Sequence, residues 1–578
     1  MHAQAFEQPL GRVVSIRGSN ASIGILEPRP NDDENARITV GKFVSIRTGQ
    51  LTLIGIVMEV GLQEAATGRD HGYFAIAKVD LMGEIREELG GVPRFRRGLR
   101  NYPGIGDPAT LMTAAELRLA YAAADRAMID IGYLHQDSGV GGYIRVDDLL
   151  SKHFALLGST GVGKSSGVAV ILHEVMKARP ELRIFLIDPH GEYSHCFEDQ
   201  AEILTQRNLR LPFWLFSFEE ILNVWFGGRD GIDEEIDTLT ELIPLAKSAY
   251  AQHRTLRREL RNAGFTVDTP VPYRLADLIT LIDERMGKLE NRSTRLVYLK
   301  LIARIEAVRK DPRYGFMFDN ANVGGDTTIQ LLRQLFQLPP TDKRMTILQL
   351  AGFPAEAMDA VVSVVCRMAF DFGLWSDGIF PLLFVCEEAH RYAAADPALG
   401  FVPTRRAISR IAKEGRKYQI FLGLVTQRPT ALDSDILSQC GTLFAMRLIN
   451  DRDQALLRSA VSDAAADLSI FIPSLSTREV FVFGEGVALP ARLVFRELPH
   501  DLLPRREGHG SSDTGIEATD DFLRLVLEQW RGAMTSGASQ TEIAMTLPTY
   551  PYLDDVPDSW DDGDSPSAPR NPHLKPAF

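Results

Sequence analysis

The chain has 578 residues, a length that predicts several domains. Hydrophobic residues make up 45% of it and charged residues 24%, which is the ordinary balance of a globular protein and excludes a mostly disordered chain. The net charge of −13 argues against nucleic-acid binding at first sight, but such binding depends on local basic patches and not on the total charge.

The cysteines and the first residues exclude other classes of protein. Four cysteines are scattered without a C-x-x-C pair, which argues against a zinc site or a disulfide framework and favours a reducing compartment. The first residues lack the basic and apolar regions of a signal peptide, and no run is long and apolar enough to span a bilayer. We therefore expect a cytoplasmic protein without a membrane segment.

Short β-strand patterns, with turn signals between them, occupy residues 9 to about 90. Their close and fairly regular spacing predicts a small β-barrel, which we assign to residues 1–90. We expect residues 91–146 to be a bridging segment that leads to the next domain.

A phosphate loop of the form G-x-x-x-x-G-K-[ST] follows an apolar strand pattern at 154–157 and precedes a helical pattern. We expect it to bind the nucleotide through Gly158, Ser159, Thr160, Gly161, Val162, Gly163, Lys164, Ser165 and the adjoining Ser166. Glycines let successive backbone N–H groups curl around a polyphosphate, and the helix N-terminus adds its positive dipole end. Lys164 can reach the β- and γ-phosphates and Ser165 can hold Mg²⁺, so ATP with Mg²⁺ is the expected ligand.

The phosphate loop belongs to an α/β core that a long helical pattern interrupts. β/α alternation begins near Asp147 and resumes with an apolar strand at 345–350. Apolar residues recur at helical spacing between these two parts, and the simplest interpretation is a bundle that packs and spaces without chemistry. The resulting assignment is core 147–218, helical insertion 219–340, core 341–500, C-terminal helical extension 501–545 and disordered acidic tail 546–578.

A second apolar strand pattern, at 382–386, ends in Glu387 and Glu388. We assign Glu387 to the metal ion and Glu388 to activation of the attacking water. Most strands of this kind end in Asp-Glu, so Glu387 departs from the general pattern. Two surface acids at a helix start are the simpler alternative. The position favours catalysis, because open α/β sheets bind ligands at the carboxyl ends of their strands.

A third apolar strand pattern, at 421–425, ends in Thr426 and Gln427. Gln427 would place an uncharged hydrogen-bonding group near the γ-phosphate and so distinguish ATP from ADP. The basic stretch 410–418 precedes this strand. A cation there could stabilise charge on a phosphoryl group held by a neighbouring subunit, or the stretch is the solvated basic end of a helix.

A fourth strand pattern, at 184–187, is followed by a polar turn that contains Asp188 and Glu192. These two carboxylates could add contacts around the nucleotide. A purely structural turn is an equal alternative, because proline and glycine lie between them.

Together these motifs resemble the HerA family of hexameric DNA-translocating ATPases, in the FtsK/HerA superfamily. The resemblance extends from about residue 9 to about residue 500. Besides the phosphate loop, it rests on Asp-Pro-His-Gly-Glu-Tyr at 188–193, Glu-Glu-Ala-His at 387–390, Glu-Gly-Arg-Lys at 414–417 and Thr-Gln-Arg-Pro at 426–429. It implies an α/β fold with a RecA-like P-loop core, an N-terminal barrel of the HAS type and a helical insertion. Glu-Glu at the end of the second strand is usual in this family.

The resemblance also implies roles for basic residues. The Arg-Lys region of the family matches Arg416, which we expect to be the arginine finger, with Arg410 and Lys413 as the other candidates. The family has a basic residue just before the phosphate-loop strand, and Lys152 occupies that position in this chain.

The resemblance further implies a homo-hexamer with ATP sites between subunits and double-stranded DNA in a central channel. Relatives work with a partner nuclease of the NurA type, and bacterial forms accompany sirtuin-like or nuclease effectors in antiphage defence. No nuclease or sirtuin motif is apparent in this chain, so a partner would supply cleavage, with the barrel as the expected docking face. The alternative is a hexameric scaffold whose ATP binding serves to assemble and activate an effector.

DNA contacts should be Lys or Arg side chains that hold backbone phosphates without reading bases. Each basic patch taken alone is more simply a solvated face. The candidates are Arg94, Arg96, Arg97 and Arg100, then Arg254, Arg257, Arg258 and Arg261, then Arg405 and Arg406.

Overall fold

The computed structural model describes most of the first 505 residues of the chain. The described residues are 9–26, 37–62, 73–87, 93–121, 127–229, 231–253, 264–288, 292–319, 325–339, 342–396, 398–460, 467–505, 524 and 527. Residues 1–517 form one compact unit, to which the barrel and the large sheet both belong. The expected acidic tail at 546–578 lies outside the described residues, and so does the expected helical extension at 501–545 apart from 501–505, 524 and 527.

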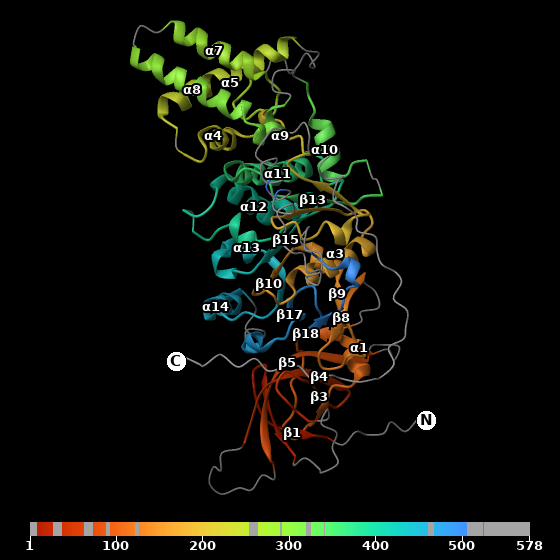
Figure 1. Cartoon of the computed structure of the whole chain (residues 1–578). Helices are drawn as coiled ribbons and strands as arrows, with labels where there is room; N and C mark the ends of the chain where they lie inside the picture. Colours follow the sequence, from red (N-terminus) through yellow and green to blue (C-terminus); the bar gives the residue numbers. More distant parts are fainter. Residues whose placement is uncertain are drawn as a thin grey trace, which may run out of the picture. The chain divides into compact units, whose positions relative to one another are not determined.

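Six antiparallel strands close into a barrel in the order β2-β1-β7-β3-β4-β5, with β5 pairing back to β2, and a seventh strand, β6, extends β5 (Figure 1). Apolar side chains on the inner face fill it, among them Val13, Ile23, Val44 and Leu53. The strands are β1 (Gly11–Arg17), β2 (Asn20–Ile25), β3 (Phe43–Thr48), β4 (Leu51–Leu62), β5 (Ala75–Glu87), β6 (Pro93–Arg97) and β7 (Pro108–Leu111). The predicted N-terminal barrel is confirmed.

The segment 91–146, which we expected to be a bridge, instead divides between two sheets. Its strand β7 fills the gap between β1 and β3, and without that strand the barrel would stay open. Strands β8 and β9 of the same segment pair with each other, and β8 also pairs with β18 at the end of the large sheet. For short strands with weak sequence patterns, the sheet edge that they cover decides which sheet they join.

The large sheet has eleven strands in the order β12-β13-β11-β14-β15-β10-β16-β17-β18-β8-β9. Every pairing from β12 to β16 is parallel, and every pairing from β16 to β9 is antiparallel. The strands are β8 (Met128–Leu134), β9 (Gly141–Arg145), β10 (His153–Leu157), β11 (Arg183–Asp188), β12 (Ala201–Leu204), β13 (Met345–Gln349), β14 (Leu382–Cys386), β15 (Ile420–Thr426), β16 (Cys440–Ala445), β17 (Glu479–Gly484) and β18 (Ala491–Phe495).

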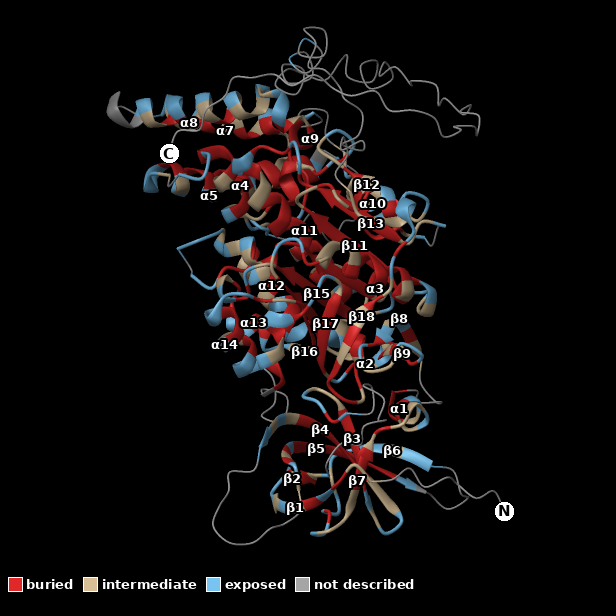
Figure 2. Cartoon of the chain, turned by 60° about the horizontal axis from the view of Figure 1, so that its bottom comes forward, coloured by how far each residue is buried: buried red, intermediate tan, exposed pale blue. Residues whose placement is uncertain are grey.

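The core of the protein lies in the parallel half of this sheet. Every residue of β10, β11, β13, β14 and β15 is buried, which explains why these strands read as continuous apolar runs (Figure 2). Outside the segment between β12 and β13, the described helices are α1 (Ala114–Tyr121), α2 (Val146–Ser151), α3 (Lys164–Ala178), α11 (Ala355–Trp375), α12 (Val402–Glu414), α13 (Ser434–Leu437) and α14 (Asp451–Ala460). Among the helices that the structure describes, none combines the length and the apolar character needed to cross a bilayer.

Helices occupy the chain between β12 and β13, two strands that are direct parallel neighbours. They are α4 (Phe218–Phe226), α5 (Asp233–His253), α7 (Leu275–Gly287), α8 (Arg292–Lys310), α9 (Gly315–Phe318) and α10 (Thr328–Phe336). Figure 1 shows α5, α7 and α8 side by side. A parallel pair needs only a short crossover, so most of this segment is additional to what the sheet requires.

Glu220 joins the first of these helices to the core. It completes a capping box with Ser217 at the start of α4, where the Ser217 N–H donates to Glu220 Oε2 at 2.6 Å. From α11, Ser363 Oγ donates to Glu220 Oε1 at 2.7 Å and Arg367 Nη2 donates to Glu220 Oε2 at 2.8 Å. The Glu220 side chain is 1% exposed, so its charge depends on these partners.

We expect Glu220→Ala to lower the apparent Tm by about 5 °C, because it leaves Arg367 and the α4 N-terminus without their acceptor, a loss of about 3 kcal/mol. Differential scanning fluorimetry measures this change. Glu219→Ala is the matched control, since Glu219 forms an exposed ion pair with Arg406 and should change the Tm by less than about 1 °C. Equal effects of the two substitutions would contradict the role given to Glu220.

Candidate nucleotide site

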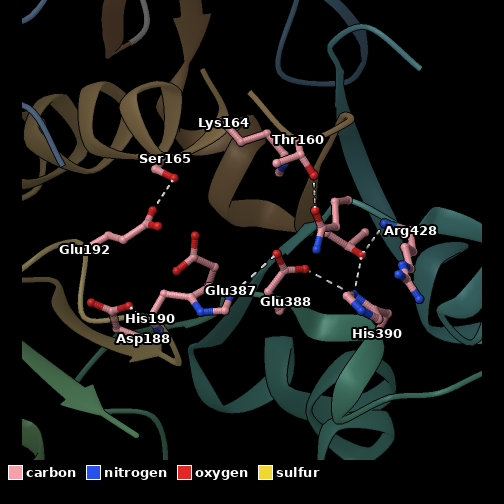
Figure 3. Close-up of polar contacts among 12 residues, drawn as sticks. Thr160, Lys164, Ser165, Asp188, His190, Glu192, Glu387, Glu388, His390 and Arg428 are labelled. Carbon is pink, nitrogen blue, oxygen red and sulfur yellow. Dashed lines mark hydrogen bonds and ion pairs between the residues drawn. The ribbon is translucent and has the colours of Figure 1, made fainter. Parts of the chain in front are cut away.

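The four predicted motifs meet at one edge of the large sheet. Strands β10, β15, β14 and β11 are parallel, so the chain leaves all of them at the same edge. The phosphate loop follows β10, Gln427 follows β15, the Glu387–Glu388 pair follows β14, and the polar turn begins at the end of β11. Figure 3 shows side chains from these segments directed toward one another. This is where open α/β sheets bind ligands.

The phosphate loop has the backbone geometry that its sequence predicts. Gly161 and Gly163 have φ of +77° and +94°, values that favour glycine, and Gly163 is the N-cap of α3. A side chain at Gly158 would come within 2.8 Å of Met446. Two bonds fix the base of the loop: the Gly158 N–H donates to the Thr426 carbonyl at 3.3 Å, and the Ser159 N–H donates to the Arg447 carbonyl at 2.9 Å. The helix N-terminus and the loop form an anion site.

Lys164 begins α3, and its ammonium lies over the loop. Its Nζ donates to the Ser159 carbonyl at 2.9 Å. Burial lowers the pKa of Lys164, while the nearby carboxylates Glu388, Glu387 and Glu192 act in the opposite direction. An ammonium has three donors, so one bond to the loop leaves donors that can reach phosphate oxygens.

The predicted metal ligands lie on facing elements. Ser165 Oγ, in the first turn of α3, donates to Glu192 Oε2 at 2.9 Å. Across from it, Glu387 Oε1 accepts a bond from the Tyr193 hydroxyl at 3.1 Å, whereas Glu387 Oε2 is buried without a hydrogen-bond partner among the described residues. Burial, with Asp188 and Glu192 nearby, raises the pKa of Glu387 well above its ordinary value.

An unsatisfied buried carboxylate oxygen is costly, and a cation would satisfy it. Mg²⁺ prefers oxygen ligands and is held by one or two protein groups together with substrate phosphates. Ser165 and Glu387 therefore fit Mg²⁺.

The turn after β11 separates the roles of its two carboxylates. Asp188 accepts backbone N–H bonds from His190, Gly191 and Tyr193 at 3.2, 2.8 and 3.0 Å, so it holds the turn in shape. Burial raises its pKa, and these bonds oppose that rise. Glu192 instead contacts Ser165. The sequence left open a structural turn or contacts around the nucleotide. Asp188 has the structural role, and Glu192 has the contact beside the phosphate loop.

Two histidines flank Glu388. His390 Nδ1 lies 3.2 Å from Glu388 Oε2, and His190 Nε2 lies 4.0 Å from Glu388 Oε1 (Figure 3). Burial alone would raise the pKa of Glu388, but His390, with Lys164 and His190, holds it below its ordinary value. Glu387 and Glu388 are thus adjacent carboxyls with opposite shifts, the pattern expected when two acids have different tasks.

Glu388 also has φ of +50°, a left-handed backbone that non-glycine residues rarely adopt. Such a conformation persists only where its surroundings impose it, and it is common at functional sites. Our reasoning from the sequence missed both histidines and Tyr193. The available signal was that all three lie within a few residues of the carboxyl end of a buried strand.

The predicted sensor residue Gln427 contacts the phosphate loop. Thr160 Oγ1 donates to Gln427 Oε1 at 2.5 Å. The preceding residue, Thr426, lies 3.0 Å from His390 Nδ1 through its Oγ1, which also accepts the Arg428 N–H at 3.0 Å. A continuous polar chain therefore runs from the end of β15 through His390 to Glu388.

The predicted basic residues lie at the other edge of the sheet. Lys152 precedes β10 and pairs with Glu485 at 2.5 Å. Arg416 precedes β15 and lines a surface cavity of about 360 Å³. The five residues of β10 separate that edge from the phosphate loop by about 16 Å, more than an extended arginine side chain covers. The structure does not bring either residue to the phosphate loop of its own chain.

The other candidates for the arginine finger lie on α12, before Arg416. Arg410 stacks on the Phe370 ring, with its guanidinium carbon 4.0 Å from the ring centroid, and it pairs with Asp371 at 3.5 Å. Lys413 lies in the last turn of α12. The contacts of Arg410 fix its side chain within its own subunit.

The basic patches proposed for DNA have different surroundings. Arg405 pairs with Asp433 at 2.7 Å, and Arg406 forms an exposed pair with Glu219 at 3.1 Å. Arg94, Arg96, Arg97 and Arg100 are exposed at or near the outer strand β6 of the barrel sheet. The patch of Arg254, Arg257, Arg258 and Arg261 lies outside the described residues.

We expect His390→Ala to lower the kcat of ATP hydrolysis by on the order of 10- to 100-fold, because Glu388 loses the contact that orients it. Affinity for ATP should change by less than about threefold, since His390 does not touch the phosphate loop. Steady-state kinetics and nucleotide titration measure these two quantities.

His390→Asn should recover part of the activity, because its amide nitrogen can take the place of Nδ1. Arg391→Ala, at the exposed neighbouring position, is the control and should behave like the unsubstituted chain. A full rate for His390→Ala would show that Glu388 needs no support from this side chain.

Comparison with known proteins agrees with this geometry. The family described as "Helicase HerA, central domain" matches residues 129–369. A probable helicase of Methanocaldococcus jannaschii is 26% identical over 467 residues, which cover 78% of this chain and 82% of that protein. The DNA double-strand break repair helicase HerA of Pyrococcus furiosus is 25% identical over 437 residues, 70% of this chain and 74% of that protein.

Among solved structures, VirB4 of Thermoanaerobacter pseudethanolicus matches with a TM-score of 0.45 and 17% identity, over 65% of this chain and 98% of that one. The family match covers the phosphate loop and the polar turn after β11, and the relatives extend the similarity over most of the chain. The chain thus contains the central domain of the HerA family, and its similarity to HerA and other helicases extends over most of its length.

Proposed function

We propose that the chain is an ATP-driven motor that moves double-stranded DNA through a ring of six copies. The observation that carries this proposal is the division of the site between two edges of one sheet. The phosphate loop and carboxylates lie at one edge and Arg416 at the other, so only a second copy can bring the two together. A head-to-tail contact of this kind closes into a ring when its rotation allows.

Within one subunit, the phosphate loop and the α3 N-terminus hold the phosphates of ATP, and Lys164 contacts the β- and γ-phosphates. Ser165 and Glu387 hold Mg²⁺, which when bound neutralises charge that develops on the phosphate oxygens. Glu388, which stays ionised because its neighbours offset the rise in pKa that burial would cause, orients the attacking water and accepts its proton. Gln427, tied to Thr160, lies where it can respond to the γ-phosphate.

From the neighbouring subunit, Arg416 stabilises the charge on the transferring phosphoryl group. Lys152 lies at the same edge and is a second cation that the neighbour can present. Because hydrolysis then requires two subunits, nucleotide turnover at one interface can change the contact between them. This coupling is what converts turnover into movement of a ring.

DNA as the substrate is supported by the relatives, since several are DNA double-strand break repair helicases by name. A motor that holds backbone phosphates needs only a few cations in each subunit, because the ring repeats them around the channel. This requirement is compatible with the net charge of −13. We further propose that the motor acts in the cytoplasm with a partner nuclease or defence effector, docked on the barrel.

We expect linear duplex DNA to raise the rate of ATP hydrolysis several-fold in a particle with the mass of six copies, and high salt to abolish the rise.

Lys164→Ala should abolish nucleotide binding, because it removes the cation that contacts the phosphates. Glu388→Gln should still bind ATP but lose on the order of 10²-fold or more in kcat. ATPase assays, nucleotide titration and light scattering provide these measurements.

A hexamer whose turnover ignores DNA but rises with an effector would favour the scaffold over the motor. Unchanged ATP affinity in Lys164→Ala would contradict the assignment of the phosphate loop. Normal turnover in Glu388→Gln would move the catalytic role to another residue.

We expect Arg416→Ala to lower kcat by on the order of 10³-fold while ATP affinity is retained. The decisive measurement mixes Arg416→Ala with Glu388→Gln. Each variant is inactive alone, but a mixed ring places an intact Arg416 from one chain against an intact Glu388 from the other, so activity should return.

The control is the double variant Arg416→Ala, Glu388→Gln mixed with either single variant, where no complete site can form. Absence of recovery in the first mixture would indicate that Arg416 does not act on a neighbouring subunit. Recovery with Arg410→Ala in place of Arg416→Ala, together with a comparable loss of kcat, would transfer the role to Arg410.

A further inference from the structure

Three large apolar side chains are exposed at the end of α11 and on the short turn that follows it. Trp375 is 84% exposed, Ile379 is 71% exposed and Phe380 is 37% exposed. Single exposed apolar residues are ordinary, but a tryptophan with two such neighbours on one turn is characteristic of a contact surface. Tryptophan is also the residue type that most often dominates the energy of protein interfaces. We call residues 375–380 the apolar turn.

The apolar turn has a fixed backbone. Asp377 and Gly378 both have positive φ, +52° and +68°, and the Gly378 N–H donates to the Gly373 carbonyl at 3.0 Å. The Phe380 ring stacks on Phe372 with the centroids 6.1 Å apart. The exposed side chains are therefore presented by a turn that a backbone hydrogen bond and a ring stack hold in one conformation.

The apolar turn packs directly against the segment that carries Arg416. A side chain at Gly378 would touch Gln419 and Tyr418 at about 3.1 Å, and the Leu382 N–H donates to the Gln419 carbonyl at 2.9 Å. Pro381, which follows the apolar turn, lines the same cavity as Arg416. The apolar turn and the segment that carries Arg416 therefore lie next to each other at this edge of the sheet.

The opposite edge of the sheet also exposes apolar side chains. Ile449 is 72% exposed and lies two residues after Arg447, whose carbonyl holds Ser159 of the phosphate loop. Leu399 is 66% exposed in the segment between Glu388 and α12. A head-to-tail contact joins two different surfaces of identical chains. This chain has the apolar turn at one of the two edges that such a contact would join, and exposed apolar side chains on segments that leave the other.

We propose that the apolar turn, centred on Trp375 and Ile379, supplies the apolar contact that holds two copies together at their interface. The same interface presents Arg416 to the next copy. The occupant of this surface is a second copy of the chain, on the side that bears the phosphate loop, Ile449 and Leu399. The inference rests on the proposed function, because it assigns a surface to the contact that the divided site requires. Apolar contact there supplies affinity, and Arg416 is held in register beside it.

The experiment compares Trp375→Ala, Ile379→Glu with the unsubstituted chain by sedimentation velocity across a range of concentrations, with ATP and Mg²⁺ present. We expect the variant to need at least tenfold more protein to assemble. It should bind ATP with unchanged affinity and keep its Tm, and its turnover should recover at high protein concentration. Leu299→Glu is the control, since Leu299 is 51% exposed on α8, which packs against α4, α5 and α7 of the helical insertion.

Assembly of the variant at the same concentrations as the unsubstituted chain would overturn this inference and leave the proposed ring intact. Failure of the unsubstituted chain itself to assemble at any concentration would overturn both. If the variant assembles normally but no longer stimulates a nuclease partner, the apolar turn binds that partner and the inference is wrong. Trp375→Phe should assemble nearly as the unsubstituted chain does, which separates loss of apolar contact from loss of fold.

Discussion

The parallel register of β10, β15, β14 and β11 is the constraint on which the rest of the structure depends. Because these four strands run in one direction, every segment that follows them emerges at the same edge, and every segment that precedes them lies at the other. The strands are buried on both faces, so a change in their order or direction would expose a large apolar area. The nucleotide site is therefore positioned by the same burial that stabilises the core.

The surroundings at that edge shift the pKa values of two neighbouring carboxyl groups in opposite directions. Glu387 is enclosed, bonded by Tyr193 and left with one buried oxygen that a cation can satisfy, whereas Glu388 lies between two histidines. The two residues are adjacent in the chain but face different partners, and Glu388 has a left-handed backbone. One acid is thereby suited to a metal ion and the other to a water molecule. The polar chain through Thr426 links the second acid to the strand that carries Gln427.

The same register places Arg416 and the phosphate loop at opposite edges of the sheet. A cation that precedes β15 cannot reach a loop that follows β10, its direct neighbour in the sheet, unless it belongs to another molecule. In the assembly that we propose, one contact serves both assembly and hydrolysis, because the apolar turn at 375–380 packs against the segment that carries Arg416. Under this proposal, a change at the phosphate would be transmitted directly to the neighbouring subunit, as a motor requires.

The sequence alone determined those features that depend on neighbouring residues. Glycine at positions of positive φ, apolar runs long enough for buried strands, and acids at the strand ends predicted the phosphate loop, Glu387, Glu388 and Gln427, because each is a property of a few consecutive residues. The tertiary structure decided the features that depend on residues far apart in the chain. Tyr193 and Glu387 are 194 residues apart, and the division of 91–146 between two sheets depends on which edges needed a strand. Strand order and side-chain pairing across the sheet follow from packing over the whole core, and local periodicity carries no record of them.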